Sequence, residues 1–171
     1  MSLRGAPEVR PASSSTPSTM SLHPATSHIE SVHTLDVLGA SVRILLDGHQ
    51  THGAFALIEL TGQPGDSVPP HVHRREEETF HVLEGELEIW CDGHTVRLRA
   101  GDTFFAPRNR PHSPKFVGTQ PGRLLITLTP AGFERAFREL DGLSAGGAPD
   151  MAAVSELLQR YGCEFLPPLA G

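Results

Sequence analysis

The 171-residue chain lacks several features that mark common classes of protein. It has no apolar run close to the ~18 residues that a transmembrane helix needs, which excludes a helical membrane span. Its formal net charge of −6 gives no excess of positive charge to attract phosphates, so we expect no nucleic acid partner. Its two cysteines, Cys91 and Cys163, form no CxxC pair, which argues against a thiolate zinc site or a redox dithiol. We therefore predict a cytoplasmic protein with neither membrane nor nucleic acid as partner.

Large apolar side chains are scarce in residues 1–30, which are mostly Ser, Thr, Pro and Ala. Such a segment buries too little surface to offset its ordering entropy, so we predict a disordered tail. It holds no apolar stretch of a secretory signal; a transit peptide is a minor alternative, and Met20 is an alternative start. The remaining length suits one domain, which we assign to residues 31–145, followed by a C-terminal helix and tail at 146–171.

Short apolar segments alternate with turn residues over residues 32–129, a pattern typical of an all-β sandwich or barrel. Asp92-Gly93 between two such segments predicts a hairpin with a type I′ turn. Helical spacing then predicts a helix over 131–141 and a second one that is capped by Asp150 and ended by Gly162, both packed outside the sheets. The predicted strands are Val42–Leu46, Ala54–Leu60, Thr79–Leu83, Leu87–Cys91, Thr95–Leu98, Thr103–Ala106, Ser113–Val117 and Leu124–Thr129.

Histidine is abundant, and five of the ten histidines fall between residues 71 and 112. His71 and His73 are two residues apart, so on an extended backbone both imidazoles project to the same side and can share one ion. Glu78 follows on the next strand, although alternation alone does not distinguish it from Glu76 or Glu77. His112 opens a later strand that could lie beside the first. Imidazole with carboxylate suits Fe, Mn, Ni, Cu or Zn and a site with open positions.

Two segments resemble the paired motifs of the cupin superfamily. Gly65, His71, His73, Glu78 and Gly85 match G-x5-H-x-H-x4-E-x6-G at every spacing. The second motif, G-x5-P-x-G-x2-H-x3-N, is matched by three further residues and departs at two positions. The matching residues are Gly101, Pro107 and His112; Asn109 replaces the usual Gly, and Phe116 replaces the final Asn. Asn tolerates the left-handed conformation, so we expect the turn to survive.

The resemblance implies an all-β, cupin-type jelly-roll β-barrel that binds one divalent transition metal through His71, His73, Glu78 and His112. The residues after Thr129 also resemble the tail of bacterial single-domain cupins of the quercetin 2,3-dioxygenase-like kind. The resemblance further implies a homodimer, because relatives bury their sheet edges against a second copy. Glu78 has a possible second role, as the catalytic base that accepts a substrate proton.

Other candidate residues receive more ordinary interpretations. We expect His81 to face outward, His94 to be solvated beside a turn, and the charge run Arg74–Glu77 to form a solvated loop. Glu59 lies on an apolar segment and is an alternative second carboxylate of the site. Four apolar strand residues are candidates for a cavity wall, and Cys91 for a buried small side chain. The four wall candidates are Phe80, Phe104, Phe105 and Ile126.

The expected function is that of a metal-dependent dioxygenase acting on a small aromatic or enolic substrate. The alternative is a non-oxidative metal-binding cupin, either an isomerase or epimerase or a module that binds a small ligand. A metal-free storage cupin is a third reading, which the intact set of four candidate ligands disfavours.

Overall fold

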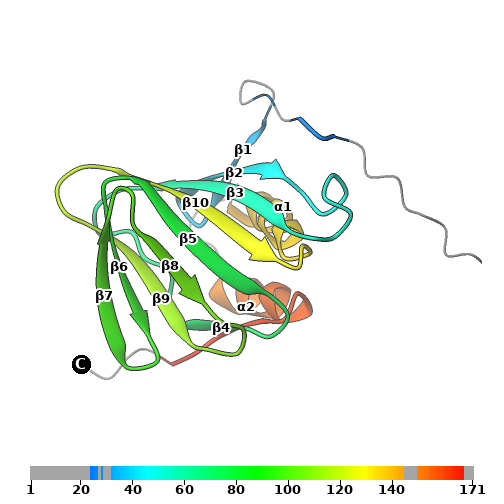
Figure 1. Cartoon of the computed structure of the whole chain (residues 1–171). Coiled ribbons are helices and arrows are strands. Elements are labelled where there is room, and N and C mark those ends of the chain that lie inside the picture. The colour runs from blue at the N-terminus through cyan, green and yellow to red at the C-terminus, as the bar shows by residue number, and fades with distance from the viewer. Residues whose placement is uncertain (1–23, 27, 29–31, 145–149, 168–171) are drawn as a thin grey trace, which may run out of the picture.

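Two antiparallel β-sheets face each other and enclose the core (Figure 1). The computed structural model describes residues 24–26, 28, 32–144 and 150–167. Most of the expected tail, residues 1–30, lies outside the described residues. The strands are β1 (Thr34–Val37), β2 (Ala40–Leu46), β3 (Ala56–Gly62), β4 (His71–His73), β5 (Glu77–Glu84), β6 (Glu86–Cys91), β7 (His94–Arg99), β8 (Thr103–Ala106), β9 (His112–Val117), β10 (Gly122–Thr129) and β11 (Cys163–Phe165).

The strand order is β1-β2-β3-β10-β5-β8 in one sheet and β11-β4-β9-β6-β7 in the other. Side chains alternate along a strand, so every second one points into the space between the sheets. In β5 these side chains are Glu78, Phe80 and Val82. The corresponding residues of β10 are Leu124, Ile126 and Leu128. Burial of the apolar side chains among them stabilises the fold, and it fixes the register that carries Glu78 into the interior. The arrangement is the jelly roll that the sequence predicts.

All eight predicted strands are present, and the described part of the chain forms three further strands that the sequence does not predict. The missed strands are β1, with four residues, and β4 and β11, with three residues each, which are too few for alternation to show. The most consequential is β11, because it pairs with β4 in the register Cys163↔His73 and Phe165↔His71. The C-terminal segment, predicted as helix and tail, therefore also extends the sheet at the strand that carries two of the candidate ligands.

Two turns adopt the backbone conformations that their residues predict. Asp92 and Gly93 have φ of 50° and 88°, the two positive values that a type I′ turn between β6 and β7 requires. Asn109 has φ of 63°, so asparagine here takes the left-handed conformation for which glycine is usual. The Asn109 amide donates a hydrogen bond of 2.8 Å to the His73 carbonyl, which ties this turn to β4.

The two helices pack outside the sheets, as predicted. Helix α1 (Glu134–Ser144) lies beside β1, and α2 (Met151–Arg160) lies beside β11 (Figure 1). The first begins at Glu134 and not at residue 131, because Gly132 has φ of 145°, which no helix accommodates. The second is capped as predicted: the Asp150 carboxylate accepts a hydrogen bond of 2.9 Å from the Ala152 amide. Within the described ranges, neither helix has the length and apolarity that crossing a bilayer requires.

Candidate metal centre

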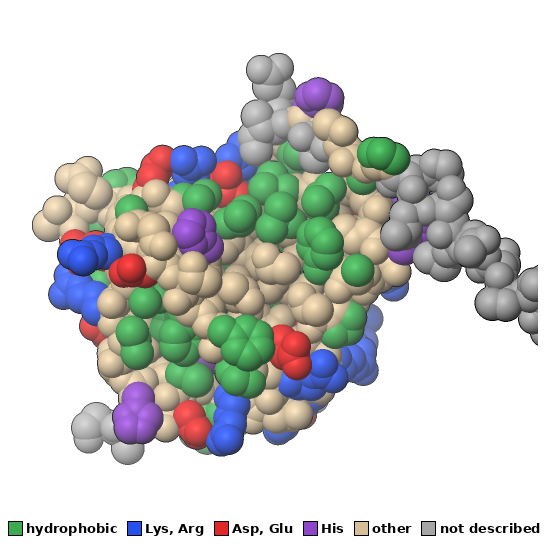
Figure 2. All heavy atoms as spheres, viewed as in Figure 1, with side chains coloured by type: hydrophobic (Ala, Val, Ile, Leu, Met, Phe, Trp, Pro, Cys, Tyr) green, Lys and Arg blue, Asp and Glu red, His purple; other side chains and the backbone are tan. Residues whose placement is uncertain are grey.

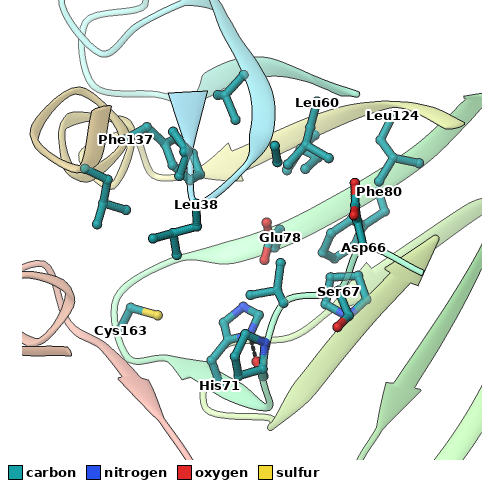
Figure 3. A pocket seen from close by; sticks show the side chains of 18 of the residues that line it. Leu38, Leu60, Asp66, Ser67, His71, Glu78, Phe80, Leu124, Phe137 and Cys163 are labelled. Atoms are coloured by element: carbon teal, nitrogen blue, oxygen red, sulfur yellow. Dashed lines mark hydrogen bonds between the residues drawn. The ribbon is translucent and has the colours of Figure 1, made fainter. Parts of the chain in front are cut away.

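The four predicted ligands come from both sheets and converge between them. His71 and His73 lie on β4, and His112 of β9 is the Cα partner of His71 in the register of these two strands. Glu78 comes from β5 in the opposite sheet, where its neighbours on the inner face are apolar. Figure 3 shows His71 and Glu78 approaching one cavity from these two sides. The close pairing of β4 and β9, which the sequence leaves open, brings the third imidazole to the other two.

Each of the four side chains is buried, and one donor atom of each lies within 4.8 Å of the others. Glu78 Oε2 is 3.0 Å from His112 Nε2 and 3.4 Å from His73 Nε2. The ring centroids of His71 and His112 are 4.3 Å apart. Donor atoms about 2.1 Å from a common ion can be separated by at most about 4.2 Å. The cluster therefore fits one ion after a small inward movement.

Backbone carbonyls fix the orientation of two of the imidazoles. His71 Nδ1 donates a hydrogen bond of 2.9 Å to the Pro69 carbonyl, and His112 Nδ1 donates one of 3.1 Å to the Arg110 carbonyl. A carbonyl oxygen only accepts, so Nδ1 must carry the proton in both rings. In the neutral ring the lone pair is then on Nε2, which is the tautomer that binds a metal; His112 reaches this state when its Nε2, hydrogen-bonded to Glu78, loses its proton.

Electrostatics hold two of the four groups in their metal-binding charge states at neutral pH. Burial, reinforced by His112 and His73, lowers the pKa of His71 to about 3, so this ring is neutral. Burial alone would raise the pKa of Glu78, but the hydrogen bond with His112 and the adjacent imidazoles outweigh it and lower that pKa to about 2. Burial alone would lower the pKa of His112, but the hydrogen bond to Glu78, the negative charge of Glu78 and the bond to the Arg110 carbonyl together outweigh burial and raise that pKa. A carboxylate oxygen only accepts, so His112 Nε2 carries a proton in its hydrogen bond to Glu78, and a metal ion must displace that proton.

The charge run Arg74–Glu77 is only partly the solvated loop that the sequence predicts. Arg74 pairs with Glu164 at 2.7 Å and Glu77 with Arg108 at 3.3 Å, both at the surface. Glu76 is instead 3% exposed, and its carboxylate lies beside His73. The prediction was wrong for Glu76, because the segment just before helix α1, more than fifty residues later in the chain, packs here: Gly132 lies close to the Glu76 carboxylate and the Phe133 ring lies against His73.

Glu59 is buried as well but belongs to a different cluster. Its carboxylate forms ion pairs with Arg43 of β2 and Arg123 of β10, the two strands that flank β3. It does not line the cavity beside the candidate ligands. The alternative that Glu59 supplies a second carboxylate to this site is therefore wrong. His81 lies outside the cavity too, and its Nδ1 is 2.8 Å from the Thr103 hydroxyl.

A cavity of about 250 Å³ lies against three of the four side chains, namely His71, His73 and Glu78. Phe80 and Ile126 line it as predicted; Phe104 packs against the core without lining it, and Phe105 is 54% exposed. Cys91, predicted as buried, is half-buried. Additional lining residues come from the turn after β1, from both helices and from β11, and no local sequence signal predicts them. They include Leu38, Phe133, Phe137, Leu140, Leu158 and Cys163.

The wall of the cavity is apolar apart from the candidate ligands and one polar edge. Asp66 and Ser67, both exposed, mark that edge and lie across the cavity from Leu38 (Figure 3). Among the described residues, no Lys or Arg lines the cavity. Its volume is close to the lower end of the roughly 300–1,000 Å³ of small-molecule sites. The site therefore suits a small, largely apolar and uncharged molecule with a few hydroxyl groups.

A jelly roll with three histidines and a glutamate between its sheets is typical of the cupins. Comparison with known families supports this class, because the Cupin_2 family, described as the cupin domain, matches residues 59–128. The chain is a member of the cupin superfamily.

Two curated relatives and one solved structure indicate where the chain stands within the superfamily. It is 34% identical over 98 residues to quercetin 2,3-dioxygenase of Bacillus subtilis (57% of this chain, 29% of the relative). It is 30% identical over 100 residues to polyketide synthase CurC of Streptomyces cyaneus (58% and 65%). The matches thus span less than two thirds of either relative. The structure of the polyketide cyclase RemF from Streptomyces resistomycificus superposes with a TM-score of 0.54 at 26% identity (63% of this chain, 80% of that one).

Proposed function

We propose that this protein is a metal-dependent dioxygenase that acts on a small aromatic or enolic molecule. The observation that carries the proposal is a buried cluster of three imidazoles and one carboxylate, of which His71, His73 and Glu78 line an apolar cavity. The likeness to quercetin 2,3-dioxygenase supports the oxidative reaction.

The donor set fits a divalent transition metal, namely Fe, Mn, Ni, Cu or Zn, held by His71, His73, Glu78 and His112. With four protein ligands, one or two coordination positions are left for the substrate. A bound ion of this kind acts as a Lewis acid, which lowers the pKa of a coordinated enol or phenol. The absence of thiolates from the set distinguishes it from a closed structural zinc site.

The chain's own residues supply the remaining chemistry. Glu78 is a carboxylate at neutral pH, so it can accept the hydroxyl proton of an enol that lies beside it. Phe80 and Ile126 form flat apolar walls that exclude water and can pack against a planar ring. Asp66 and Ser67 can hydrogen-bond a hydroxyl group at the far end of the substrate. The lack of a cationic side chain among the described lining residues argues against a carboxylate or phosphate ester as substrate.

A non-oxidative reaction is the second candidate, and the likeness to CurC and RemF favours it. A polyketide is rich in enolisable carbonyl groups, so the same cluster and the same base would serve it. In this case Glu78 moves a proton from carbon or oxygen, and dioxygen takes no part.

Oxygen uptake separates the two candidates. Metal-loaded protein is mixed with flavonols or β-diketones in an oxygen electrode, with Glu78→Gln as the matched variant. We expect oxygen uptake to match the loss of substrate, and we expect both to decrease strongly in Glu78→Gln. Conversion without oxygen, supported equally by redox-inert zinc, would establish the second candidate and refute the dioxygenase.

We also propose that the protein forms a homodimer through an apolar outer face. Phe105 and Val96 are the most exposed large apolar side chains of the sheets, at 54% and 41%. Figure 2 shows apolar side chains gathered near the middle of one face and charged ones of both signs around its margin. Light scattering at micromolar concentration should give twice the 18.4 kDa of one chain, and a mass near 18.4 kDa would contradict this proposal.

A further inference from the structure

Two buried polar atoms beside the metal centre stand out because each lacks a hydrogen-bond partner. Among the residues that the structure describes, these are the only buried side-chain nitrogen or oxygen atoms without one: His73 Nδ1 and Glu76 Oε2. They face each other at 3.7 Å, and both side chains are 4% exposed. A buried polar group without a hydrogen bond lowers folding stability by roughly 1–3 kcal/mol, so two such atoms side by side are unusual in a folded protein.

His73 differs from the other two histidines because its Nδ1 atom lacks a hydrogen-bond partner. The Nδ1 atoms of His71 and His112 each donate to a backbone carbonyl two residues earlier in the chain. The corresponding atom of His73 has no carbonyl acceptor, and Glu76 Oε2 is the polar atom that faces it. The rest of His73 is firmly held: the Asn109 amide binds its carbonyl, and the edge-to-face Phe133 ring lies 4.5 Å from its own.

We propose that Glu76 is a positioning residue for the metal centre, which accepts a hydrogen bond from His73 Nδ1 and thereby directs the Nε2 lone pair at the ion. The proposal rests on the metal-dependent function proposed above. A shift of less than 1 Å between the two side chains brings 3.7 Å to hydrogen-bond length. All three imidazoles then have Nδ1 donating to an oxygen and Nε2 turned to the centre.

The charge balance of the buried centre supports the same role. With neutral imidazoles, Glu78 and Glu76 contribute two negative charges, which a divalent cation neutralises. Buried charges are tolerated where they are compensated. A carboxylate hydrogen-bonded to a ligating histidine also makes the ring a stronger donor, and its loss typically weakens metal binding 10–100-fold.

A purely structural role for Glu76 makes a different prediction. If Glu76 only held the loop between β4 and β5 against the start of α1, its replacement would destabilise the metal-free protein and leave metal affinity unchanged. If Glu76 positions His73, the metal-free protein keeps its stability, because an uncompensated buried carboxylate contributes nothing favourable to it. Metal affinity falls instead.

The test measures Co²⁺ affinity, by visible absorption and by competition with a chelator, in wild type, Glu76→Gln and Glu76→Leu. Glu77→Gln is the matched control, because Glu77 is the next residue and pairs with Arg108 at the surface. Urea denaturation of each metal-free protein reports folding. Glutamine keeps an acceptor for His73 Nδ1 without the charge, whereas leucine removes both, so the two variants form a graded pair.

We expect a roughly 10-fold weaker affinity for Glu76→Gln, a loss approaching 100-fold with a changed Co²⁺ spectrum for Glu76→Leu, and wild-type affinity for Glu77→Gln. Unchanged affinity in both Glu76 variants, while wild type binds one Co²⁺, overturns the positioning role and leaves the proposed function intact. A Glu76→Gln protein that is destabilised without metal but binds Co²⁺ as wild type does overturns it too. Failure of wild type to bind Co²⁺ refutes the metal centre itself.

Discussion

Acidification of the metal-free protein should remove about 3 kcal/mol of stability that depends on one residue, His71. Its pKa is lowered from 6.5 to about 3, chiefly by burial and further by His112 and His73. Between pH 6.5 and pH 4.5 the unfolded chain binds a proton at this position and the folded chain does not. The stabilising effect is therefore complete above pH 6.5 and is lost as the pH falls. Two pH units at about 1.4 kcal/mol each correspond to about 3 kcal/mol.

Two other groups of the cluster define the comparison that isolates this effect. The raised pKa of His112, which the hydrogen bond and charge of Glu78 cause against the effect of burial, acts in the opposite direction: its stabilising contribution is complete below pH 6.5 and is lost as the pH rises through the folded-state pKa. The pKa of Glu78 is lowered to about 2 from 4.5, so its stabilising contribution is lost mainly below pH 4.5. Wild type must therefore be compared with His71→Gln, which lacks only the first group.

The assay is urea denaturation of both proteins after treatment with a chelator, at pH 7 and at pH 4.5. We expect the stability of wild type relative to the variant to decrease by about 3 kcal/mol between the two conditions. The constant cost of losing the bond from His71 to the Pro69 carbonyl cancels in this comparison. A difference that is the same at both pH values would refute the claim that a buried, neutral His71 faces the other imidazoles.

Three further predictions concern the metal, the core and one turn. A divalent ion at 100 times its dissociation constant should increase the free energy of unfolding by about 2.7 kcal/mol and raise the thermal midpoint by roughly 5–10 °C. The variant His112→Ala should lose this shift of the midpoint. An equal shift in the variant would mean that the ion binds at another site. Gly122→Ala should lower the free energy of unfolding in urea by about 1–3 kcal/mol, because the new Cβ would lie 2.3 Å from the Phe116 ring; unchanged stability would contradict this packing. Asn109→Ala should lower the free energy of unfolding by about 1 kcal/mol and Asn109→Gly by much less, because φ is 63° at this position and alanine disfavours the left-handed conformation. Equal losses of stability in thermal melts would show that the backbone is not left-handed.

Features that depend on local spacing could be predicted from the sequence. Short apolar segments between turn residues mark eight of the strands, and the Asp92-Gly93 pair defines a hairpin whatever lies around it. The set His71, His73, Glu78 and His112 followed from motif spacing and from the resemblance to a family. The structure brings these four residues together.

Features that depend on distant packing could not be predicted. Three consecutive glutamates, Glu76 to Glu78, look equivalent in sequence, yet the first is buried beside His73, the second is paired at the surface, and the third faces the histidines. The strand β11 has three residues, and its partner β4 lies about ninety residues earlier. Burial of Glu59 likewise requires arginines from two neighbouring strands.

The most direct test of the metal centre is the metal content of the purified protein after equilibrium dialysis against a divalent transition metal. Wild type should retain one ion per chain, and the double variant His73→Ala/His112→Ala should retain none while its circular dichroism still reports the folded sheets. Equal metal content in the two proteins, or none in either, would contradict the account.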